Sequence, residues 1–171
     1  AKAGLVFGII ASAYMFITQF MAAGSWPAIL QMAVNALLWM LKFVGCIWLM
    51  MFYMKKLVKD YPQADNSSTF RFGCITAALS ALIYAAVSFA NYAFISPEFL
   101  SGQIDAVMQQ MAPMLDSNTM AETEKMIDKM PQITFFSNLI YCFIYGTLLS
   151  AILSRMIPSK DPFADYKPDE Q

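Results

Sequence analysis

A single charged residue, Lys42, interrupts the longest apolar stretch of the chain. It lies within residues 28–54, a run long enough to cross the hydrocarbon core of a bilayer, which takes about 20 apolar residues. A charge near the middle of a membrane span is costly, so we expect Lys42 to face partners inside the protein. No Asp or Glu lies in any of the apolar runs to neutralise it.

Tyrosine and asparagine residues recur at matching depths in the apolar runs. Three tyrosines, one in each of the other runs, lie about 11 residues from the charged end of their run, as Lys42 does, which is roughly 17 Å. In three runs an asparagine lies seven residues farther on, a step that returns to nearly the same helix face. The predicted midplane polar site has seven members: Lys42, Tyr14, Tyr84, Tyr145, Asn35, Asn91 and Asn138.

Two interpretations of the midplane polar site remain open. In the first, the amides and phenols hydrogen-bond between helices, and the Lys42 ammonium lies against tyrosine faces or oxygens. In the second, the layer is a site in which Lys42 binds an anionic head group or is itself uncharged. A purely structural layer should be fully packed, whereas a ligand site needs a cavity that leads to Lys42.

Catalytic and metal-binding motifs are lacking. The chain has no histidine, which removes the usual general base and the commonest metal ligand. Cys46, Cys74 and Cys142 lie inside apolar runs without metal-ligand spacing, so we interpret them as small core residues. No glycine-rich phosphate loop is present. We therefore expect a non-catalytic protein without a cofactor.

The composition indicates a membrane protein. Hydrophobic residues make up 58% of the 171 residues and charged residues only 13%, against about a quarter in soluble domains. The net charge is -1 and no region is basic enough to suggest nucleic acid. The expected partners are the lipid bilayer and either another membrane protein or a second copy of the chain.

Four apolar runs predict an all-α, polytopic membrane protein with four transmembrane helices. The first and third runs carry small residues at four-residue spacing, including Gly4 and Gly73, which let helices approach closely. The predicted spans cover residues 3–21, 28–54, 72–95 and 132–156.

Lysine and arginine gather on one side of these spans. Lys2, the predicted loop 55–71 and Arg155 lie on that side, whereas segment 96–131 on the other side has six acids and two lysines. Because positively charged loops stay in the cytoplasm, we predict cytoplasmic termini in a multi-pass membrane protein. Residues 157–171 are predicted to be a disordered cytoplasmic tail.

Segment 96–131 predicts a short amphipathic helical hairpin outside the membrane. Its first half has apolar residues at helical spacing, and Thr119 with Glu122 fits a capping box at the start of a second helix. The apolar faces are expected to cover the bundle or lie on the membrane. A weaker alternative is a thioether site for a soft cation such as Cu(I), formed by Met108, Met111 and Met114.

Several short motifs resemble a known family. They are AGLVFGII near the start, FRFG before the third span, SPEF after it, and IYGTLLSAIL followed by RM in the last span. They resemble an uncharacterised family of small Gram-negative inner-membrane proteins with a domain of unknown function. The resemblance implies four helices, brings no catalytic residues and suggests a neighbouring polyprenyl-phosphate glycosyltransferase.

Two functions follow as hypotheses. The first is a non-catalytic accessory or scaffold subunit of a cell-envelope system, which the resemblance links to polyprenyl-phosphate glycosyltransferases. The alternative is a small transporter or a lipid- or anion-binding membrane protein whose midplane site is centred on Lys42.

Overall fold

The computed structural model describes residues 2–22, 24, 27–61, 63–111 and 129–157. Within these ranges the chain forms helices and no strands, so the all-α prediction is confirmed. The helices are α1 (Lys2–Ala22), α2 (Ala28–Asp60), α3 (Asn66–Ala90), the π-helix η1 (Asn91–Ile95), α4 (Pro97–Met111) and α6 (Met130–Met156).

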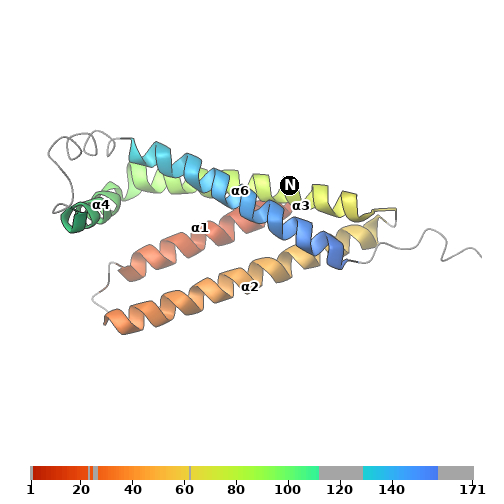
Figure 1. The fold of residues 1–171 in the computed structure, drawn as a ribbon, viewed down its shortest axis with the longest axis horizontal. Coiled ribbons are helices and arrows are strands. Elements are labelled where there is room, and N and C mark those ends of the chain that lie inside the picture. Colours follow the sequence, from red (N-terminus) through yellow and green to blue (C-terminus); the bar gives the residue numbers. More distant parts are fainter. Residues whose placement is uncertain (1, 23, 25–26, 62, 112–128, 158–171) are drawn as a thin grey trace, which may run out of the picture.

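Four helical segments are long and apolar enough to cross a membrane. They are α1, α2, α3 together with η1, and α6, and the most apolar window of each has a mean hydropathy between 1.7 and 1.9. The chain is therefore a multi-pass membrane protein. Both predicted long runs of the amino-terminal half are helical, and they form an antiparallel pair (Figure 1).

The loop between the second and third spans is shorter than predicted. Helix α2 continues to Asp60 because its lysines are good helix formers, and α3 begins at Asn66. Asp65 caps α3: its Oδ1 accepts hydrogen bonds from the Ser68 N–H and hydroxyl, both at 2.7 Å. These two bonds from Ser68 also lower the pKa of the exposed Asp65 carboxyl.

Helix α3 is central, with α1 and α6 packed along it (Figure 1). Small residues make these contacts close, and Ala81 and Ala85 on α3 are fully buried. A Cβ placed on Gly146 of α6 would lie 2.5 Å from the Cβ of Ala77, so only glycine fits there. We call the contact of α3 with α1 and α6 the small-residue seam.

Helix α2 is held differently. Near its carboxyl end, Met50 and Met54 pack in a buried cluster with Leu153 and Ile157. Toward its amino end α2 diverges from α3 and α6 and lies beside α1 (Figure 1). Helix α2 is thus anchored at one end and loosely packed at the other.

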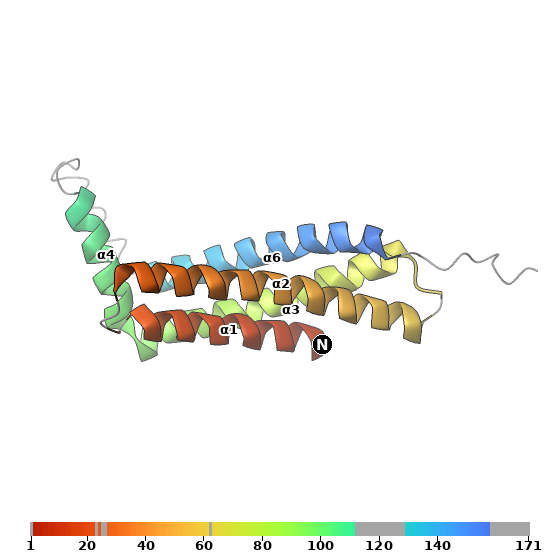
Figure 2. The ribbon, with the colours of Figure 1, turned by 90° about the horizontal axis from the view of Figure 1, so that it is seen from below.

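The charged residues separate to the two ends of the bundle. At the end where α2 stops and α3 starts, five exposed basic side chains form the basic end: Lys55, Lys56, Lys59, Arg71 and Arg155. Helix α4, with exposed Glu98 and Asp105, projects from the opposite end (Figure 2). The second predicted helix of the outer segment and all but the first residue of the predicted tail lie outside the described residues.

Candidate functional site

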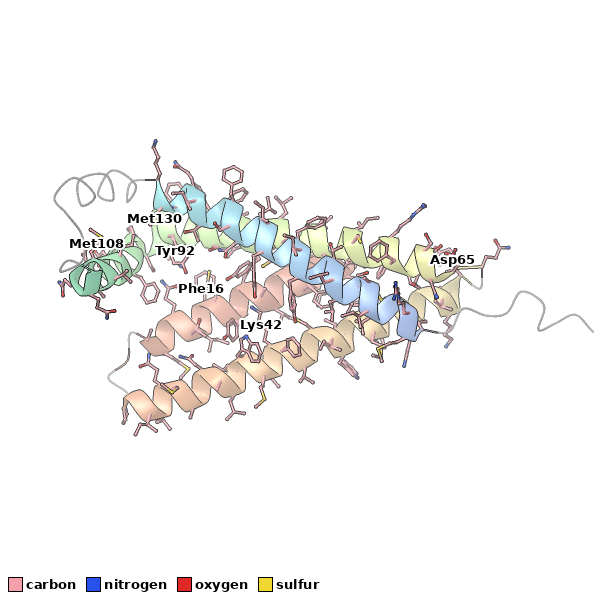
Figure 3. The ribbon with its side chains drawn as sticks, in the orientation of Figure 1. Phe16, Lys42, Asp65, Tyr92, Met108 and Met130 are labelled. Atoms are coloured by element: carbon pink, nitrogen blue, oxygen red, sulfur yellow. The ribbon has the colours of Figure 1, made fainter. Side chains whose placement is uncertain are left out.

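The ammonium of Lys42 lies beside two tyrosine rings. Its Nζ is 4.4 Å from the ring centroid of Tyr14 on α1 and 5.6 Å from that of Tyr84 on α3. Both distances are within the range in which a cation is attracted to an aromatic face. Lys42 projects from the inner side of α2 into the space next to α1 (Figure 3). Three of the seven predicted site residues are therefore in one cluster.

No carboxylate of the spans balances this charge. Helices α1, α3 and α6 contain no Asp or Glu, and the one acid of α2 is Asp60 at its end. Asp60 is 18 residues from Lys42 along the helix, a separation of about 27 Å. An ammonium has three hydrogen-bond donors. A ring face attracts the charge but does not accept a hydrogen bond as strongly as an oxygen atom does. Lys42 can therefore accept an anionic partner.

A cavity of about 220 Å³ adjoins Lys42. It exceeds the roughly 150 Å³ of an apolar cavity known to hold a benzene molecule. All four spanning helices line it, and the lining is mostly apolar. The polar residues of the lining include Lys42 of α2 and Thr76 and Ser80 of α3. This chemistry suits a ligand with an anionic group and an apolar part.

Four exposed aromatic residues of the cavity lining lie on α2 and α6. We call Trp39, Phe43, Tyr141 and Tyr145 the aromatic rim. Trp39 stacks on Phe43 within α2 at 5.4 Å, and Tyr141 stacks on Tyr145 within α6 at 6.5 Å. The two pairs meet where Phe43 and Tyr145 lie 6.3 Å apart. Tyr145, predicted to lie with the other tyrosines near Lys42, is thus a rim residue that shares the cavity with it.

The three predicted asparagines do not bond to one another. Asn91, which is fully buried, donates from Nδ2 to Gln19 Oε1 at 2.9 Å. Asn138 donates from Nδ2 to Ser88 Oγ at 2.9 Å. The Oδ1 of Asn35 is buried and has no partner among the described residues. Two of the three amides thus join helices: Asn91 joins η1 to α1, and Asn138 joins α6 to α3.

Sequence reasoning missed Gln19, Ser88, Thr76 and Ser80. A signal was available for the last two, because Ser80 and Thr76 precede Tyr84 by four and eight residues and so share its helix face. Gln19 is the one side-chain amide of the first span, and its depth matches the asparagine layer. Hydroxyls and single amides are common in membrane helices, so these residues do not indicate a site from the sequence alone.

The alternative metal site is largely outside the described part of the chain. Met108 lies half-buried on α4, whereas the side chain of Met111 and all of Met114 are not described. Among the described residues, no group of three His, Cys, Asp or Glu side chains could hold a metal ion. The free thiols Cys46 and Cys142 line the cavity, and Cys74 lies on α3.

Comparisons with known proteins give a family. A family model described as a protein of unknown function (DUF4199) matches residues 2–157, which include every described helix. No curated protein and no solved structure matches the chain. The chain, with its four helices long enough to span a membrane, therefore belongs to the DUF4199 family of proteins of unknown function.

Proposed function

We propose that the protein binds an anionic ligand within the membrane, with Lys42 holding the negative group, and that it catalyses no reaction. The observation that carries this proposal is the cavity of about 220 Å³ beside Lys42. A layer that served only to join helices would be packed, and the cost of a charge near the midplane would bring no function. A bound anion supplies the counter-charge that the spans lack.

The cavity residues have distinct roles in this proposal. The ammonium of Lys42 donates to the anion, and Thr76 and Ser80, which line the same cavity, also carry hydroxyl donors. The rings of Tyr14 and Tyr84 hold the ammonium in place while the site is empty. The site lacks histidine and carboxylates, the commonest general bases, which supports binding over catalysis.

Ligand-dependent thermal stability of purified protein in an uncharged detergent tests the proposal. Dodecyl phosphate and inorganic phosphate are the probes, and Lys42→Met is compared with Lys42→Arg and the wild type. At a probe concentration 100 times the Kd, the wild type should gain about 2.7 kcal/mol of stability. Lys42→Met should fold and show no gain, while Lys42→Arg should keep part of it. Equal gains in wild type and Lys42→Met would refute the proposal.

The second candidate is an accessory or scaffold subunit of a cell-envelope system, such as one built on a polyprenyl-phosphate glycosyltransferase. The outward face of α2 is the surface on which such a subunit would pack, because Leu41 and Trp48 are 71% and 67% exposed there. A photo-crosslinking residue at Leu41 would capture such a subunit in cells, with Phe20 of α1 as the control position. Crosslinks to lipid alone would remove this candidate.

The proposed location is a bacterial inner membrane with the basic end in the cytoplasm. The exposed lysines and arginines of that end support this orientation, because such residues are retained on the cytoplasmic side. Ser117→Cys should react with an impermeant thiol reagent in cells with a permeabilised outer membrane, and Ser67→Cys should not. The opposite labelling pattern would invert the topology.

A further inference from the structure

We infer that the ligand of Lys42 is a membrane lipid with a phosphate or carboxylate head group, and that it reaches the cavity sideways between α2 and α6, through the aromatic rim. This inference rests on the proposed function and adds the source of the anion and its route. Three observations carry it: the position and exposure of the rim, the apolar depth of the cavity, and the one-ended anchoring of α2.

The rim faces the exterior at mid-span. Tyr141 is 70% exposed and Trp39 is 57% exposed, while Phe43 and Tyr145 are 38% and 37% exposed. Trp39, Phe43 and Lys42 lie in the middle of α2, far from either end of that 33-residue helix. At this depth the surrounding medium is lipid chains, so the rim opens to the apolar part of the bilayer and not to water. A lipid head group reaches Lys42 only by leaving the membrane interface, and pairing with the ammonium offsets that cost.

The cavity continues from Lys42 toward the basic end between apolar walls. Met50 of α2, Leu149 of α6 and Phe7 of α1 line this part. Beyond it, the buried cluster that includes Met54 and Leu153 closes the bundle. A soluble anion has no polar path through that cluster. A lipid would place its charged group at Lys42 and an apolar chain along these walls.

The rim can widen without breaking the bundle. Its two aromatic pairs stack within their own helices, and Phe43 with Tyr145 is the ring contact between the two pairs. The close contacts of small residues lie elsewhere, between α3 and its neighbours α1 and α6. Because α2 is anchored near Met50 and Met54, its rim-bearing half can move away from α6 while the anchor holds.

Tryptophan quenching by brominated lipids in nanodiscs tests the source of the anion. A Trp26→Phe, Trp48→Phe variant keeps Trp39 at the rim, and the matched Trp26→Phe, Trp39→Phe variant keeps Trp48, which is not part of the cavity lining. Brominated phosphatidic acid should quench Trp39 at a mole fraction at least threefold lower than brominated phosphatidylcholine does. Trp48 should show no such preference, and Lys42→Met should remove it from Trp39.

The outcomes separate this inference from the function on which it rests. Quenching of Trp39 that is equal for both lipids would overturn the lipid inference. If inorganic phosphate alone then gave thermal stabilisation that depends on Lys42, the proposed anion site would stand with a soluble ligand. If neither lipid nor phosphate gave any effect dependent on Lys42, both would fail.

A reversible crosslink across the rim tests the route. The single-Trp39 protein is used with Cys46, Cys74 and Cys142 replaced by alanine. Cysteines introduced by Phe43→Cys and Tyr145→Cys are then joined by a bifunctional methanethiosulfonate linker, whose two disulfides a reductant cleaves. Brominated phosphatidic acid added from vesicles should quench Trp39 at least tenfold more slowly in the linked protein, and cleavage should restore the rate. The unlinked double variant is the control for folding. Equal rates in linked and unlinked protein would rule out the lateral route.

Discussion

The two sides of α3 and the inner face of α2 meet their neighbours in opposite ways. Along the small-residue seam, glycine, alanine and serine let backbones approach until no further carbon atom fits. On α2, a lysine and bulky aromatic residues keep the helices apart and leave a cavity. The difference shows that small residues give this bundle its rigidity, whereas large residues create the space that a ligand can use.

Matched glycine substitutions should give the largest effect. A Cβ on Gly73 of α3 would lie 2.6 Å from Ser150 Cβ and 2.7 Å from Met54 Cε, whereas a Cβ on Gly45 of α2 has nothing within 4 Å. Gly73→Ala should destabilise the protein by about 1 to 3 kcal/mol, as overpacking does. Gly45→Ala should be neutral or stabilise it by up to about 1 kcal/mol, because alanine is the better helix former. Thermal unfolding in one detergent measures both.

Equal responses of the two glycine variants would contradict the distinction between the two regions. Gly102 on α4, which also has open space around it, is a second control. Gly102→Ala should resemble Gly45→Ala.

The amide pair between α1 and η1 should give an effect comparable to that of Gly73→Ala. Asn91→Leu keeps the branched shape of the side chain with a larger volume, and it leaves Gln19 Oε1 without its hydrogen-bond donor. Leaving a buried polar group unpaired costs about 1 to 3 kcal/mol. The double variant Gln19→Leu, Asn91→Leu should recover part of that loss. If the double variant lost as much stability as the two single variants together, or more, the two side chains would not act as a pair.

The smallest effect concerns the cap of α3, outside both regions. Because the hydrogen bonds from Ser68 lower the pKa of Asp65 in the folded protein, the carboxylate adds stability above its ordinary pKa of 3.8. This contribution is lost as the pH falls through the lowered pKa. Asp65→Asn keeps a capping side chain and removes the titration, so its unfolding midpoint should depend less on pH below 4. An unchanged acid dependence would contradict this role.

The four helices could be predicted because hydropathy and length decide membrane spans almost alone, as residues 28–54 show. Counting residues from the charged end of each span also predicts that Lys42 lies at the same depth as Tyr14 and Tyr84. In the structure, its ammonium lies beside both rings. The partners of Asn91 and Asn138 could not be predicted, because they depend on how each helix is rotated and how far it slides. The cavity depends on the divergence of α2, a property of whole helices.

The anchoring of α2 has a consequence for the response of the protein to bilayer thickness. Ala28 at the free end of α2 lies about 39 Å from the anchoring Met54, and Lys42 lies about 18 Å from it, so tilting the helix by about 5° moves the free end by about 3 Å and Lys42 by about 1.5 Å. A long helix tilts more in a thin bilayer and less in a thick one. Bilayer thickness should therefore change the separation of α2 from α6, and with it how readily the cavity fills.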